Sequence, residues 1–151
     1  MVCDFDGVIV DGINEYWLSS KNAYLKILGN LSDNYDLHPD VPKAFKYLRP
    51  WVEHGWEMVL LAAELLKPDS HLNQGNFKQF AANYPQKCKE ALHGLELSPE
   101  ELQKALNDVR KEAIAKDYQN WLNNHKAFPG VSNRLNQLEA EGIDLIVLTT
   151  K

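Results

Sequence analysis

The stretch VCDFDGVIVDG, residues 2–12, opens the chain. Asp4 and Asp6 follow a short apolar approach, and Gly7 precedes a second run of β-branched residues. This pattern predicts a strand, a loop and a second strand. Side chains two positions apart on an extended backbone point the same way, so we expect both carboxylates to face one reacting centre.

The other end of the chain carries a second strand signal. Residues 143–148, IDLIVL, predict a buried strand of the parallel type, and Thr149 follows it directly. A helix is expected just before this strand, with Val131, Leu135 and Leu138 facing inward. Because a helix that leads into a strand makes a right-handed crossover, we expect the first and last strands to lie parallel in one sheet.

The middle of the sequence is helical in pattern. The expected helices cover residues 14–28, 42–52, 58–66, 77–94 and 99–121, with a loop over 31–40 and a kink or boundary at Pro85. Residues 58–66 are apolar nearly all round, which predicts a buried helix. Ser98 and Glu101 have the spacing of a capping box at the start of the last helix. The order of elements therefore predicts an α/β fold with a large helical insertion.

Composition limits the classes of partner. The 151 residues suit a single domain, and the chain holds no apolar run of the ~20 residues that a membrane helix needs. Sixteen Lys and Arg are interleaved with 21 Asp and Glu, so we expect neither a nucleic-acid partner nor a membrane partner. Two distant cysteines and the lack of an export signal favour the reducing cytoplasm.

Asp4 and Asp6 stand where a strand runs out into a loop, which is where ligands bind in open α/β sheets. An aspartate can attack phosphorus while a second one handles the proton. Because attack of one anion on another needs a cation, and hard oxygen ligands suit Mg²⁺, magnesium is the implied cofactor. The Thr149 hydroxyl can donate a hydrogen bond to a phosphoryl oxygen at the same centre.

At these residues the sequence resembles a known family. Residues 4–11, DFDGVIVD, resemble the first motif of the haloacid dehalogenase-like (HAD-like) superfamily, and residues 147–151, VLTTK, resemble its second. Residues 128–135, FPGVSNRL, are similar to the return from a helical cap in phosphoglycolate phosphatase-like and β-phosphoglucomutase-like members. The resemblance implies an α/β fold with an incomplete HAD-like Rossmannoid core, residues 1–12 and 128–151, and an inserted all-helical cap, residues 13–127.

The resemblance also implies roles for individual residues. Asp4 is the nucleophile and a magnesium ligand, and Asp6 is the general acid/base that offers its backbone carbonyl to the metal. Thr149 and Thr150 bind the phosphoryl group. The implied function is a Mg²⁺-dependent phosphatase that forms an aspartyl phosphate and acts on a small phosphorylated metabolite. Asp6 favours phosphate esters over halides, because an alkoxide leaving group needs a proton.

Two alternatives stay open. Val8 stands where many phosphatases of the superfamily have threonine and where sugar phosphomutases also vary, so a phosphomutase is one alternative. The family also needs a lysine and an acidic pair that follow the second motif, and the sequence ends at Lys151. We therefore expect a fragment with little activity, or a non-catalytic helical interaction protein. The sequence predicts neither the substrate nor the oligomeric state.

Overall fold

The computed structural model describes residues 1–29 and 40–149. The loop expected over 31–40 falls almost wholly outside these ranges, and so does Thr150. Within them the chain is mixed α/β and mostly helical. None of the helices in this part of the chain is long and apolar enough to cross a membrane.

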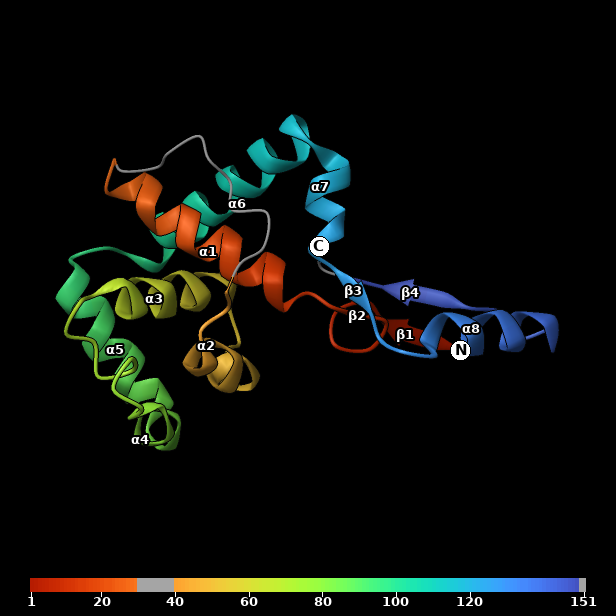
Figure 1. Cartoon of the computed structure of the whole chain (residues 1–151), viewed down its shortest axis with the longest axis horizontal. Coiled ribbons are helices and arrows are strands. Elements are labelled where there is room, and N and C mark those ends of the chain that lie inside the picture. The colour runs from red at the N-terminus through yellow and green to blue at the C-terminus, as the bar shows by residue number, and fades with distance from the viewer. Residues whose placement is uncertain (30–39, 150–151) are drawn as a thin grey trace.

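The elements form a helical block with a thinner strand end beside it (Figure 1). The strands are β1 (Val2–Asp4), β2 (Val10–Asp11), β3 (Lys126–Ala127) and β4 (Ile146–Leu148). The helices are α1 (Ile13–Ile27), α2 (Lys43–Leu48), the 3₁₀ turn η1 (Arg49–Trp51), α3 (Gly55–Leu66), α4 (Phe77–Ala82), α5 (Tyr84–Leu95), α6 (Pro99–Lys116), α7 (Tyr118–Asn123) and α8 (Val131–Ala140). We call α1 to α7 the helical block, and β1 to β4 with α8 the strand end.

The core of the helical block is built by α1, α3 and α6, which pack against one another. Helix α3 is buried on nearly every side, as its apolar sequence predicted. Leu60, Leu61, Leu102 and Leu106 are fully buried at its contacts with the neighbouring helices. Each such side chain contributes about 1.5–3 kcal/mol relative to an exposed one, so this core is the main source of stability.

The predicted capping box is confirmed at the start of α6. The backbone N–H of Glu101 donates to Ser98 Oγ at 3.2 Å, and the backbone N–H of Ser98 donates to Glu101 Oε2 at 2.7 Å. The expectation that this helix runs through Trp121 was wrong. It ends at Lys116, because Asp117 accepts a hydrogen bond from the Asn120 N–H at 3.0 Å and caps a separate helix, α7.

Two other helix boundaries differ from the sequence pattern. The helix expected over 42–52 ends at Leu48 and continues as the η1 turn, because Pro50 cannot donate a backbone hydrogen bond. The expected segment 77–94 divides at Asn83 into α4 and α5, with Pro85 in the first turn of α5. The boundary predicted at this proline is therefore confirmed.

The strands pair as two small ladders. Strands β1 and β4 are parallel, as expected, with Val2 opposite Ile146 and Asp4 opposite Leu148. Strands β2 and β3 are antiparallel, with Val10 opposite Ala127. The sequence pattern missed β3, because two residues are too few to carry an alternation.

The burial predicted for the last strand was wrong. Ile146, Val147 and Leu148 are 52%, 50% and 62% exposed. A parallel strand is buried where helices cover both faces of its sheet, and in the described residues β4 pairs on one side with β1 alone. Of the three residues expected to face inward from α8, Leu138 is buried, whereas Val131 and Leu135 are half-buried.

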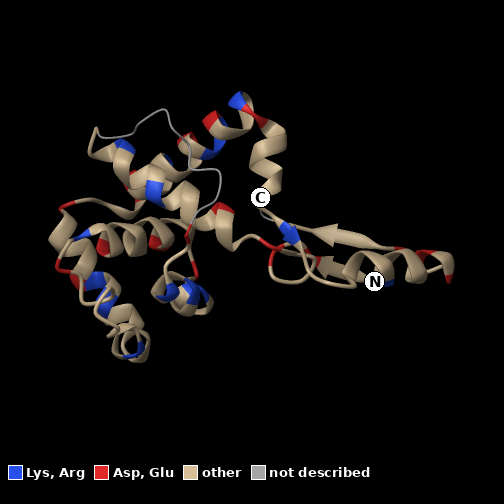
Figure 2. Cartoon of the chain, in the orientation of Figure 1, with Lys and Arg blue, Asp and Glu red and all other residues tan. Residues whose placement is uncertain are grey.

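Acidic and basic residues are mixed along the helices of the helical block (Figure 2). The mixture agrees with the interleaved signs in the sequence.

Candidate active site

The two predicted catalytic carboxylates lie on a tight turn at the end of β1. Asp4 is the last residue of the strand, and Asp6 follows two positions later. Gly7 has φ +79°, a conformation that favours glycine, and its N–H donates to the Val10 carbonyl at 2.8 Å. The Phe5 carbonyl accepts from the N–H groups of Ile9 and Val10, both at 3.0 Å. The turn is therefore held by its own backbone.

Parallel pairing brings the two ends of the chain together at this turn. Asp4 is opposite Leu148, and Thr149 is the next residue after β4. Since parallel strands end at the same edge of a sheet, Asp4, Asp6 and Thr149 share one edge. Asp4 is exposed, and its Oδ1 accepts a hydrogen bond from the Phe5 N–H at 2.6 Å.

Asp4 and Asp6 line a cavity of about 580 Å³ between the strand end and the helical block. The block contributes Arg49 from η1, Arg110 and Lys111 from α6, and Trp121 from α7. The cavity therefore has a carboxylate wall and a wall that carries cations and an indole. A cavity of this size is large enough for a small molecule.

Tyr16 joins the acid/base candidate to the first helix of the block. It is buried, and a Cβ added at Gly12 would lie 3.1 Å from Asp6 Oδ1 and 3.2 Å from the Tyr16 hydroxyl oxygen. Burial raises the pKa of Tyr16 well above its usual range; hydrogen bonding to Asp6 raises it further, and Arg49 opposes the rise. Tyr16 therefore stays protonated as a donor to Asp6, and Gly12 leaves room for the contact.

Two arginines lie against the Tyr16 ring. The Arg49 guanidinium carbon is 4.6 Å from the ring centroid, and that of Arg110 is 6.0 Å away. Arg110 is also held by Glu15, with Nε to Oε1 at 2.7 Å and Nη2 to Oε2 at 2.9 Å. Glu15 is 1% exposed and accepts a further hydrogen bond from Ser19 Oγ at 2.6 Å. This buried network fixes α6 against α1 beside the cavity.

Sequence reasoning missed Tyr16, Arg49, Arg110 and Trp121. Their sequence signals are ordinary for helical residues, and only the packing of η1, α6 and α7 brings them to one cavity. Of these four residues, Tyr16 alone had a local sequence signal, which is its position one helical turn after Gly12.

The donors that the site offers to a cation are oxygens, the ligands that Mg²⁺ prefers: the Asp4 carboxylate and, as the family resemblance implies, the Asp6 backbone carbonyl. Within residues 1–29 and 40–149, no group of three or more acidic, histidine or cysteine side chains that could hold a metal ion is present. The donor chemistry at Asp4 and Asp6 would suit Mg²⁺.

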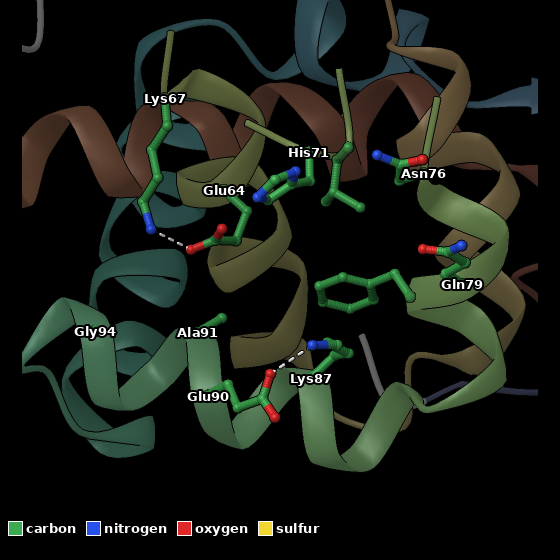
Figure 3. A pocket seen from close by; sticks show the side chains of 11 residues that line it. Glu64, Lys67, His71, Asn76, Gln79, Lys87, Glu90, Ala91 and Gly94 are labelled. Carbon is green, nitrogen blue, oxygen red and sulfur yellow. Dashed lines mark hydrogen bonds and ion pairs between the residues drawn. The ribbon is translucent and has the colours of Figure 1, made fainter. Parts of the chain in front are cut away.

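A second cavity, of about 450 Å³, lies among α3, α4 and α5 (Figure 3). Its charged residues are paired with one another: Lys67 contacts Glu64, and Lys87 lies 2.6 Å from Glu90. Phe80 adds an apolar surface. The Lys and Glu charges of this cavity are therefore balanced within it.

The chain matches no protein-family model, and no curated protein or solved structure matches it.

Proposed function

We propose that the protein is a Mg²⁺-dependent phosphate monoester hydrolase of the HAD-like type, which acts on a small phosphorylated metabolite through an aspartyl phosphate on Asp4. The observation that carries the proposal is the parallel pairing of β1 with β4. It supports a shared site for Asp4, Asp6 and Thr149, which come from segments more than 140 positions apart. Asp4 and Asp6 line the cavity, and Thr149 is not one of its lining residues.

In the first half of the reaction an Asp4 carboxylate oxygen attacks phosphorus in line. The bond from phosphorus to the ester oxygen breaks as the aspartyl phosphate forms. Asp6, protonated at this stage, gives its proton to the departing ester oxygen, and an alcohol leaves. The Tyr16 hydroxyl orients the Asp6 carboxyl group during this transfer.

In the second half Asp6 takes a proton from water. The water oxygen attacks phosphorus, the bond to Asp4 breaks, and inorganic phosphate leaves with the Asp4 carboxylate restored. The Thr149 hydroxyl donates to a phosphoryl oxygen in both halves. The Asp4 carboxylate and the Asp6 backbone carbonyl would hold Mg²⁺, which would supply charge neutralisation for the attack of one anion on another.

The proposed architecture assigns residues 1–12 and 128–151 to a HAD-like core and residues 13–127 to a cap. The helices that close the cavity opposite Asp4 support this assignment, because a helical cover limits the access of bulk water to the acyl phosphate. Thr150 is proposed as a further phosphate ligand on sequence grounds alone.

The test is release of inorganic phosphate from a panel of small phosphate monoesters in the presence of Mg²⁺. Turnover is expected to be slow, because among the described residues the proposed ligands are the Asp4 carboxylate and the Asp6 backbone carbonyl, which together would make a weak Mg²⁺ site. Asp4→Asn is expected to abolish the release and Asp6→Asn to reduce it by about 10²-fold or more. Asp69→Asn, an exposed aspartate outside the cavity, is the matched control and should leave the rate unchanged.

Two outcomes would redirect the proposal. Phosphoryl transfer that requires a sugar bisphosphate and releases no phosphate would make the protein a phosphomutase, for which Val8 leaves room. Phosphate release that survives Asp4→Asn would refute the nucleophile assignment.

A further inference from the structure

The second cavity, among α3, α4 and α5, is lined by polar side chains that a ligand can reach. Figure 3 shows Asn76 and Gln79 one above the other on the α4 wall, with both carboxamides directed into the cavity. They are three positions apart at the start of α4, so they lie on one face. Both residues are exposed, and neither carboxamide forms a hydrogen bond with another described residue. A ligand can therefore bind them by displacing water, without breaking a contact of the protein.

An aromatic ring and a leucine form the apolar part of the same cavity. Phe80 is half-buried, and Leu72 is buried. The ring of Tyr84, a residue of the core, meets Phe80 edge-on, with the ring centroids 5.9 Å apart and the planes at 68°. Tyr84 thus supports the Phe80 ring from the core side. A ring held in this way offers a surface on which a planar ligand can stack.

The charges around the cavity favour a neutral ligand. Glu64 and Lys67 form one ion pair at the α3 wall, and Lys87 and Glu90 form another on the α5 wall (Figure 3). An ionic ligand would have to compete with these contacts, whereas a neutral ligand leaves both intact. His71, the remaining ionisable residue at the cavity, is exposed and can donate or accept a hydrogen bond. The volume, about 450 Å³, lies in the range of small-molecule sites.

A ring face beside two carboxamides suits a nucleobase. A carboxamide carries an N–H donor next to a carbonyl acceptor. Adenine presents the complementary groups, an amino donor beside a ring-nitrogen acceptor, and Asn or Gln binds this edge with two hydrogen bonds. Stacking on an aromatic ring supplies the other contact, since every base has a π face.

We infer that the cavity among α3, α4 and α5 binds an adenine base, carried by a neutral nucleoside, which stacks on Phe80 and pairs with the carboxamide of Asn76 or Gln79. The residues that line this cavity differ from those that line the cavity beside Asp4. The inference therefore goes beyond the proposed function and does not rest on it.

Three probes test the inference on the whole 151-residue chain, with dissociation constants measured by saturation-transfer difference NMR. Adenosine carries the base. The riboside of 6-dimethylaminopurine keeps the ring system but loses both amino donors, and methyl β-ribofuranoside keeps the sugar alone. The wild type is expected to bind adenosine about tenfold or more tightly than the dimethyl analogue, because the analogue cannot form the paired hydrogen bonds. The ribofuranoside should not bind measurably.

Two variants remove the two kinds of contact separately. Phe80→Leu takes away the stacking surface and should weaken adenosine binding about fivefold or more. The double variant Asn76→Ala with Gln79→Leu takes away both carboxamides and should abolish the preference for adenosine over the dimethyl analogue. Because both replaced residues are exposed, the double variant should retain the fold, which circular dichroism checks.

The matched controls are Phe77→Leu and Gln119→Leu, which change the same residue types outside the cavity. They should leave the affinity for adenosine unchanged. Asp4→Asn should also leave it unchanged, because Asp4 lines the other cavity.

The inference would be overturned if the wild type did not bind adenosine, bound both nucleosides equally, or bound the ribofuranoside as tightly as adenosine. Adenosine affinity that survives both Phe80→Leu and the double variant would also overturn it. Loss of adenosine binding in Asp4→Asn would place the nucleoside at the first cavity instead. If adenosine binding depends on Phe80 while no phosphate is released from any monoester, the nucleoside site stands and the hydrolase proposal fails.

Discussion

The helical block buries its large apolar residues, whereas the strand end leaves several of its own exposed to solvent. Leu60, Leu61 and Leu106 in the block are fully buried, whereas Val147 and Leu148 in β4 are at least half exposed. The block therefore holds a hydrophobic core of its own, and the strand end adds little burial. The difference teaches that the stability of the chain and its proposed chemistry belong to different parts of the molecule.

The cavity lies where these two parts meet. The strand end contributes the carboxylates of Asp4 and Asp6, and the block contributes Arg49, Arg110 and Trp121. The proposed reactive groups are thus carried by the part with little burial, while the opposite wall of the cavity is held by the well-packed part. Tyr16 connects the two, since it lies in the block and contacts Asp6.

The largest expected effect is the loss of a core leucine. Leu61→Ala should lower the free energy of unfolding by about 2–5 kcal/mol, because it leaves a cavity among α1, α3 and α6. Val147→Ala, on the exposed strand, should cost less than about 1 kcal/mol. Urea denaturation followed by circular dichroism measures both. Equal losses in the free energy of unfolding for the two variants would contradict the difference in packing between the helical block and the strand end.

The second expected effect concerns the buried ion pair of the block. Glu15→Ala leaves Arg110 without its bidentate partner and should cost about 3 kcal/mol, the low end for a buried pair, since part of Arg110 still contacts solvent. Glu112→Ala removes the exposed pair with Lys26 and should cost less than about 1 kcal/mol. A cost for Glu15→Ala as small as that of the control would show that the network does not hold α6 to α1.

The two cysteines lie in different regions, Cys3 in β1 of the strand end and Cys88 in α5 of the helical block. Their reaction rates therefore measure accessibility in each region separately. Burial raises the pKa of the Cys88 thiol to about 11; a hydrogen bond with Tyr84 lowers it, and the charge of Glu57 raises it. At about pH 8 a thiol reagent should therefore modify Cys3, which is half-exposed, much faster than Cys88. Ellman titration of the native protein, with Cys3→Ser and Cys88→Ser as controls, measures the two rates. Equal rates would contradict a packed block.

The raised pKa of the Cys88 thiol makes the free energy of unfolding depend on pH. Because the pKa of Cys88 is higher in the folded chain than the usual value of about 8.5, the folded state holds the proton more tightly. This contribution is complete below about pH 8.5 and is lost as the pH rises to about 11. The free energy of unfolding should fall over that window, and Cys88→Ala should reduce the fall. A rise of the free energy of unfolding with pH over this window would contradict a raised pKa of Cys88.

The smallest expected effect on stability is that of the proposed nucleophile. Asp4 is exposed at the end of β1, so Asp4→Asn should change the free energy of unfolding by no more than about 0.5 kcal/mol. The same substitution is expected to abolish phosphate release. A large loss of stability would mean that Asp4 has a structural role instead.

Local patterns predicted part of this structure. The capping box of Ser98 and Glu101 and the burial of α3 follow from spacing and apolar content, and both are confirmed. The parallel pairing of β1 with β4 followed from the order of elements and a handedness rule, and it is confirmed as well. The end of α6 at Lys116 was missed, although the next residue, Asp117, is of a type that often caps a helix.

The rest depends on packing that no local pattern carries. The burial predicted for β4 was wrong, because an apolar run indicates what a strand can bury and not what covers it. The contact of Tyr16 with Asp6, the pair of Glu15 with Arg110, and the place of Arg49 and Trp121 at the cavity join residues from separate elements. The roles of Asp4, Asp6, Thr149 and Thr150 stay predictions.

The most direct test of the central claim is to trap the covalent intermediate. The whole chain is incubated with Mg²⁺ and acetyl phosphate, reduced with borohydride, digested and sequenced by mass spectrometry, because borohydride converts an aspartyl phosphate to homoserine. The account predicts homoserine at position 4 in the wild type and none at position 4 in Asp4→Asn. Homoserine at position 6 alone, or at no aspartate of the wild type, would contradict it.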